Sequence, residues 1–282
     1  MIFWNILKND IARGIFKRRY LYIISSAVMV ALVIIADMSL TKKINTYGYN
    51  GGVSAGDLYQ IFYKGSRIIK PENVTEIYIS EQYLFMILSI AFIVGNYYVK
   101  DFSSVGMQII VRCGSIKKWF ISKIMWCAAS VIYITTLVDI MIALVSLIHG
   151  YELGMNVHME LLSKYGYASK ITSVATGDII FMSIVLPILS LFTVAFVQML
   201  LSMICSPTIA LMAVSAGMIA TIFSGNALLV FNGLMCVRNN VYMVDGTYSI
   251  HMLIADIVII LISGIAGYVY VSRVDILNPK EL

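Results

Sequence analysis

The sequence predicts an all-α polytopic membrane protein with six transmembrane helices. Three observations support this fold class: the composition, a series of long apolar runs, and the placement of basic residues between those runs. Of the 282 residues, 60% are hydrophobic and only 12% are charged, and the mean hydropathy is +0.88. Soluble chains are about half apolar and about a quarter charged. The four cysteines stand singly and far apart, so the sequence predicts neither a disulfide framework nor a metal site.

Residues 1–19 predict an amphipathic helix that lies in the membrane interface. Apolar side chains recur at every fourth position on one face, and basic and amide side chains occupy the other. An ordinary basic flank before the first span is the alternative. The apolar face consists of Phe3, Leu7, Ile11 and Ile15.

Six apolar runs come close to or exceed the roughly 20 residues that cross the hydrocarbon core. The third run would extend about 45 Å as a helix, so it must tilt or project beyond the bilayer. Only residues 205–207 separate the fourth run from the fifth, and Pro207 is expected to begin the fifth helix. The predicted spans are 20–38, 83–99, 119–148, 179–204, 208–223 and 250–271.

Three longer segments connect these spans on the predicted outer side. Residues 39–82 and 149–178 are mixed in character, and the first is too long for a structureless loop, so we expect it to pack on the bundle or to contain short helices. Residues 224–249 are apolar but interrupted by polar residues, which favours a re-entrant outer hairpin before the sixth span. Residues 272–282 form a short tail.

Basic residues predict the orientation. With a cytoplasmic amino terminus, the inside segments hold twelve lysines and arginines against four acidic residues, and the outer segments hold eight against nine. Cytoplasmic segments carry the excess of basic residues in membrane proteins. The sequence therefore predicts a multi-pass plasma-membrane protein with both termini in the cytoplasm.

The cytoplasmic connector, residues 100–118, is too apolar for a freely solvated loop and too short to cross a bilayer. Ser103 or Ser104 can cap a short helix that Gly114 would end, and Ser115 can then cap the third span. Such a helix fits either a groove in a partner protein or the lipid interface. The candidate contact residues are Ser103, Ser104, Val105, Gly106, Met107, Ile109, Ile110, Arg112, Lys117 and Lys118.

Three acidic residues lie in or beside the spans, and the predicted topology puts all of them toward the outer half. They are Asp37, Asp139 and Asp256. Ionisable residues in spans usually face a bundle interior or a wet cavity. An acidic vestibule on a translocation pathway is one interpretation, and local pairing, for example with Arg238 or Lys42, is the other.

The layout resembles the permease subunits of ABC-2 type ATP-binding-cassette transporters. The local resemblance covers residues 100–123, where an acid precedes a glycine-containing short helix, a break, a basic cluster and a lysine that opens the third span. In place of the Gly-Thr pair frequent in that family, this chain has Gly106-Met107. The matching residues are Asp101, Gly106, Gly114-Ser115, Lys117-Lys118 and Lys123.

The resemblance implies the membrane subunit of an exporter, in which the short cytoplasmic helix docks on a separate ATPase. Two permease copies, or two related permeases, would join two ATPase subunits, and ATP and Mg²⁺ would bind to those subunits. The chain contains no GxxxxGK[ST] phosphate loop, and we expect it to bind no cofactor.

The expected substrate is hydrophobic or amphipathic: an antimicrobial or bacteriocin-type peptide first, as in export or immunity, then a lipid, then a drug, in a bacterial membrane. No HExxH or GxSxG motif is present, so the sequence predicts no catalytic or metal-binding residue of this chain. The alternative function is a stand-alone six-span channel, secondary carrier or membrane scaffold.

Overall fold

Five helical segments of the computed structural model are long and apolar enough to cross a membrane, counted over the residues that it describes. Those residues are 2–69, 79–95, 97–101, 106, 108–110, 115–167, 174–243 and 246–273. No strand forms within them, and this confirms the prediction of an all-α membrane protein. The five segments are α2 (Arg19–Tyr47), α4 and α5 (Glu81–Gly95 and Tyr97–Asp101), α7 (Ile116–His149), α9 to α10 (Thr176–Ile204) and α12 (Ser249–Arg273).

A sixth apolar helix, α11 (Pro207–Phe223), is shorter. Its 17 residues extend about 26 Å, slightly less than a typical hydrocarbon core of about 30 Å. The turn before it is tight, because Ser206 caps the helix by accepting a hydrogen bond from the Ile209 N–H at 3.3 Å, and proline occupies the first turn.

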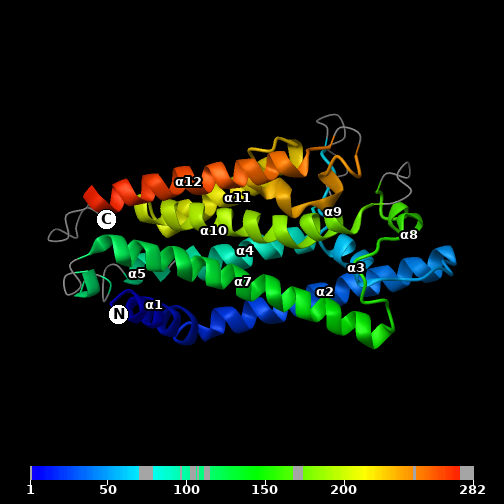
Figure 1. Cartoon of the computed structure of the whole chain (residues 1–282), viewed down its shortest axis with the longest axis horizontal. Coiled ribbons are helices and arrows are strands. Elements are labelled where there is room, and N and C mark those ends of the chain that lie inside the picture. Colours follow the sequence, from blue (N-terminus) through cyan, green and yellow to red (C-terminus); the bar gives the residue numbers. More distant parts are fainter. Residues whose placement is uncertain are drawn as a thin grey trace.

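The long helices run side by side along the longest dimension of the molecule, as Figure 1 shows. At one end lie α1 (Ile2–Ile11), α5 and the carboxyl end of α12, and we call this the α1 end. At the other lie α3 (Ala55–Phe62) and α8 (Met159–Ser163), and we call this the α3 end. The middle of the bundle is α10 (Leu186–Ile204), which packs against α4, α7, α11 and α12.

Glycines end two of the long helices. Gly48 follows α2 and Gly150 follows α7, with φ of 60° and 70° in the left-handed region that a residue without Cβ adopts readily. Helix α2 ends only at Tyr47, nine residues after Met38, where the predicted span ends. Ser115 occupies the N-cap position of α7, as predicted, but its side chain makes no capping hydrogen bond.

Short elements complete the α3 end. In α3, Ser54 and Asp57 form a reciprocal capping box, in which each side chain bonds to the other residue's backbone N–H. Two 3₁₀ turns, η5 (Val230–Leu234) and η6 (Cys236–Arg238), occupy the segment predicted as a re-entrant hairpin. The first packs against α10, α11 and α12.

Two complete π-helical turns interrupt the helical segments within the described ranges. One, η1 (Ala12–Phe16), follows α1, and the other, η4 (Phe181–Val185), lies between α9 (Thr176–Ile180) and α10. The first turn brings Gly14 against α7, where a Cβ on residue 14 would lie 2.2 Å from the Trp126 indole nitrogen. Glycine is therefore required for this close approach.

Candidate functional site

Three charged side chains meet in the interior at the α1 end of the bundle. Asp10 lies in the last turn of α1, Asp101 is the last residue of α5, and Lys123 lies in the third turn of α7. The Lys123 ammonium group contacts Asp10 Oδ1 and lies 2.5 Å from Asp101 Oδ2. The three residues are at most 5% exposed. We call this set the charged cluster.

Neighbouring polar side chains satisfy both carboxylates of the cluster. The Tyr97 hydroxyl donates to Asp10 Oδ1 at 3.0 Å, and the Ser122 hydroxyl donates to Asp10 Oδ2. The Trp119 indole N–H donates to Asp101 Oδ2 at 3.2 Å. The ammonium nitrogen of the cluster lies 4.9 Å from the centre of the Tyr97 ring and 5.3 Å from that of Trp119, within the range of cation–π attraction.

The charged cluster joins three elements that are remote in sequence. Buried ion pairs are stable only when hydrogen bonds satisfy the remaining donors and acceptors, and this cluster meets that condition. Removing one partner from such a pair leaves an uncompensated buried charge. The cluster therefore ties α1, α5 and α7 into one unit, at the two points where the connector of residues 100–118 leaves α5 and enters α7.

Gly106, within the connector, packs directly on this unit. A Cβ on residue 106 would lie 2.7 Å from the carbonyl oxygen of Asp101 and 2.8 Å from its Oδ2 atom. Only a glycine allows the connector to approach the cluster this closely, since a methyl group there would displace the carboxylate. The sequence resemblance singled out Asp101, Gly106 and Lys123, and the structure brings Asp101 into contact with both of the others.

The structure also describes four more of the predicted contact residues. Ile110 is buried, Ile109 is half-buried, and Lys117 and Lys118 are exposed. The Lys117 ammonium lies 5.3 Å from the ring centre of Tyr268, near the carboxyl end of α12. The remaining predicted contact residues, which lie outside the described ranges, are Ser103, Ser104, Val105, Met107 and Arg112.

Sequence reasoning missed Asp10, which it counted only as an inside charge. The signal was present, because Asp10 follows Phe3, Ile6 and Leu7 at helical spacing and so lies on their face. Ile6 and Leu7 are buried with it. An acid on the apolar face of a short helix indicates a buried basic partner, although it does not say which one.

Two of the predicted pathway acids bond to tyrosines at the α3 end. Asp37 is buried, accepts a hydrogen bond of 3.0 Å from the Tyr151 hydroxyl, and lies 3.6 Å from His149 Nδ1. Asp139 is half-buried and accepts a hydrogen bond of 3.1 Å from the Tyr59 hydroxyl. Both partners come from the segments that were predicted to be outer connectors.

The third acid, Asp256, is fully buried in α12 and accepts a hydrogen bond of 2.7 Å from the Ser190 hydroxyl. Its Oδ1 atom has no hydrogen-bond partner among the described residues. All three acids thus have local partners, but these are not the Arg238 and Lys42 that the sequence suggested. Their role in a translocation pathway stays a prediction.

Arg238 caps the carboxyl end of α11. Its guanidinium group donates to the carbonyl oxygens of Ser66 at 2.7 Å and Ser224 at 3.2 Å, to that of Thr221, and to Asn232 Oδ1 at 2.6 Å. Burial lowers the pKa of Arg238 to about 10. The last carbonyls of a helix have no partner within the helix and attract cations, so Arg238 stabilises α11 where it ends.

The described residues offer no cluster of metal ligands. No three histidine, cysteine, aspartate or glutamate side chains within those ranges gather closely enough to hold a metal ion. His158, one of the three histidines, pairs instead with Asp57, at 2.7 Å from Nδ1 to Oδ2. Comparison of the chain with protein-family models, curated proteins and solved structures returns no match.

Proposed function

We propose that this chain is the membrane subunit of an ATP-driven exporter of the ABC-2 type. The observation that carries the proposal is the charged cluster at the root of the cytoplasmic connector. In this proposal six helical segments cross the membrane, with α11 as the fifth, and the α1 end faces the cytoplasm. The excess of basic residues in the predicted inside segments supports this orientation.

The cluster gives the connector a mechanical role. The connector leaves the membrane at Asp101 and returns at the amino end of α7, and Lys123 holds both ends together with α1. A force applied to the connector therefore acts on three elements at once rather than on a flexible loop. A separate ATPase, which would bind ATP and Mg²⁺, would apply this force, and two copies of each subunit would form the transporter.

An apolar cavity in the bundle supports the expected substrate class. A cavity of about 320 Å³ lies between α7 and α10, and its walls include Val131, Ile188 and Phe192. All its lining residues are apolar, which suits the apolar face of an amphipathic peptide, an acyl chain or a hydrophobic drug. The predicted ranking of substrates is unchanged: a peptide first, then a lipid, then a drug.

Co-expression with the neighbouring reading frame tests the proposal, provided that this frame encodes a phosphate-loop ATPase. We expect the tagged chain to retain that ATPase in equal amount after purification, and we expect the ATPase activity to change on assembly. A chain that purifies without any phosphate-loop protein would support the stand-alone channel, secondary carrier or scaffold instead.

Two glycine substitutions separate coupling from general damage. Gly106→Ala should alter the ATPase activity of the complex, because the added methyl group displaces the Asp101 carboxylate. Gly106→Pro and Arg112→Glu should also alter this ATPase activity. The matched control is Gly177→Ala at the other end of the bundle, where a Cβ meets no atom within 4 Å. Equal effects of Gly106→Ala and Gly177→Ala would contradict a role of the connector in coupling.

A further inference from the structure

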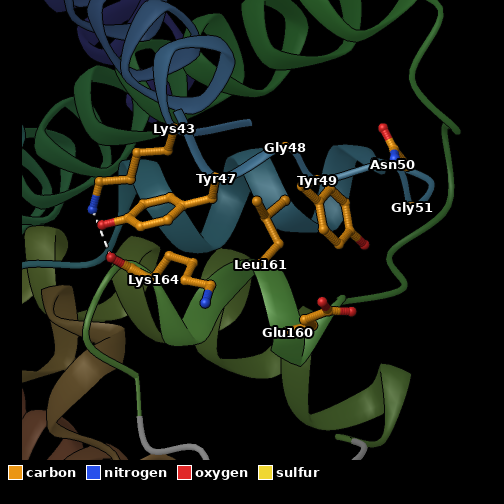
Figure 2. Close-up of a pocket in the computed structure, with 9 residues that line it drawn as sticks. All are labelled: Lys43, Tyr47, Gly48, Tyr49, Asn50, Gly51, Glu160, Leu161 and Lys164. Carbon is orange, nitrogen blue, oxygen red and sulfur yellow. Dashed lines mark hydrogen bonds between the residues drawn. The ribbon is translucent and has the colours of Figure 1, made fainter. Parts of the chain in front are cut away.

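Two adjoining cavities lie at the α3 end. The larger, of about 360 Å³, is bounded by α2, by the chain that follows α3, by the start of α4 and by Tyr165. The smaller, of about 290 Å³, is bounded by the end of α2, the turn after it and α8. Lys43 lines both cavities. Figure 2 shows the smaller one, with Lys43 and Lys164 on one side and Glu160 on the other.

Basic side chains converge around Tyr165, which lines the larger cavity. The Lys43 ammonium lies 3.8 Å from the centre of the Tyr165 ring and donates a hydrogen bond of 2.8 Å to the Lys164 carbonyl oxygen. The Lys64 ammonium lies 5.9 Å from the same ring centre. Arg67 donates to the carbonyl oxygen of Gly166, the next residue. Two lysines from two segments of the chain are therefore held around one aromatic side chain, and Arg67 is bonded to the backbone of the next residue.

The three cations raise each other's electrostatic energy. Burial lowers the pKa of Lys64, and the positive charges of Lys43 and Arg67 lower it further. Among the described residues that line the larger cavity, none is acidic. The acid Asp37 follows Ala36 of the cavity wall in sequence; it bonds to Tyr151, and its negative charge also acts on Tyr165. A bound anion would relieve this repulsion.

We propose that the larger cavity binds the phosphate group of an anionic amphiphile. Lysine ammonium groups bind phosphate as point charges, and hydroxyl and amide groups supply further hydrogen bonds. In this cavity Lys43 and Lys64 would supply the charge, and Ser39, Ser80 and Gln82 line the same space. Glu160, in the smaller cavity, repels an anion and so favours the phosphate position between the two lysines.

The depth of the cavity suits a lipid headgroup. Lys43 follows the apolar part of α2, which ends near Met38, so it lies where a membrane span meets the headgroup layer. Ala36 and Ile61 give the cavity an apolar wall. A soluble phosphate ester offers the same anion without an acyl chain. This inference goes beyond the proposed function and holds with or without an ATPase partner.

Lipid retention by the full chain tests the site. We would purify the protein in detergent, add equal amounts of phosphatidylglycerol and phosphatidylcholine, and count the retained lipids by native mass spectrometry. The wild-type protein should retain phosphatidylglycerol preferentially, because the choline group would bring a cation into the basic site. Lys43→Gln should reduce this preference about tenfold, the effect of one charge-assisted hydrogen bond.

The matched control is Lys42→Gln, which makes the same charge change at the adjacent, exposed position outside both cavities. Lys64→Gln lies on another segment and should reproduce the loss, which protects the test against misfolding of one variant. Equal retention of the two lipids, or equal loss in Lys42→Gln and Lys43→Gln, would overturn the proposal.

Glycerol 3-phosphate identifies the source of the phosphate. If it displaces phosphatidylglycerol from the wild type but not from Lys43→Gln, the site binds phosphate and a soluble ester is a sufficient ligand. If it does not displace the lipid while the Lys43→Gln effect holds, the ligand is the lipid headgroup with its chains.

Discussion

Substituting Lys123 by methionine is the most direct test of the charged cluster. The substitution keeps much of the apolar stem and removes the ammonium group, so the carboxylates of Asp10 and Asp101 remain buried without a cation. The Lys123, Asp10 and Asp101 side chains are 1%, 0% and 4% exposed, so solvent cannot screen the repulsion. Breaking a buried pair of this kind destabilises a protein by about 3–5 kcal/mol.

Unfolding of the protein in lipid nanodiscs by denaturant, followed by tryptophan fluorescence, measures this loss. Of the three tryptophans, Trp119 donates a hydrogen bond to the cluster, so part of the emission reports on the site. Lys118→Met is the control, because it removes the same charge from an exposed position on the same helix and should change the free energy of unfolding by no more than about 0.5 kcal/mol.

A triple variant separates charge from shape. In Asp10→Asn, Asp101→Asn, Lys123→Met no charge remains in the cluster, and we expect it to recover much of the stability that Lys123→Met loses, since replacing a whole buried ion pair by neutral groups is often close to neutral. If Lys123→Met loses no more stability than Lys118→Met, the cluster does not hold α1, α5 and α7 together, and the mechanical role of the connector fails with it.

Three further predictions concern residues outside the charged cluster. Arg238→Met should destabilise the protein by about 3–5 kcal/mol in the same unfolding assay, because it leaves buried carbonyls at the end of α11 without donors. The free energy of unfolding of Arg238→Lys should lie between those of the wild type and Arg238→Met. A membrane-impermeant maleimide at neutral pH should label exposed Cys205 from the cytoplasmic side and leave Cys236 unlabelled, since burial raises the pKa of that thiol to about 12 and blocks access; labelling of Cys205 from the outer side would reverse the proposed orientation. Asp139→Asn and Asp256→Asn should each impair export, measured in vesicles, while complex assembly on size exclusion stays normal; unchanged transport in both would remove these acids from the pathway.

The sequence predicted the membrane class and the places of the long helices, because both depend on local composition. An apolar run of sufficient length is helical in a membrane whatever it packs against, since the backbone must satisfy its own hydrogen bonds. Helix α12 (Ser249–Arg273) differs from the predicted span 250–271 by only a few residues. Helix ends were harder to predict, as α2 shows by continuing to Tyr47.

The partners of the buried polar groups could not be predicted in this way. Asp10 and Lys123 are 113 positions apart, and Arg238 bonds to a carbonyl 172 positions away. Such pairs depend on which helix faces meet, and a single sequence gives no information on that. The re-entrant hairpin predicted for residues 224–249 stays a prediction; the structure adds that η5 and η6 form 3₁₀ turns there, a backbone form that composition does not specify.

The sequence by itself therefore determined that this chain is a membrane protein of long apolar helices with a basic connector between residues 100 and 118. Only the tertiary structure decided that Asp10, Asp101 and Lys123 meet in the interior, and that Lys43 and Lys64 gather around Tyr165. The physical reason is that apolarity acts along the chain, whereas the desolvation of a charge depends on everything packed around it.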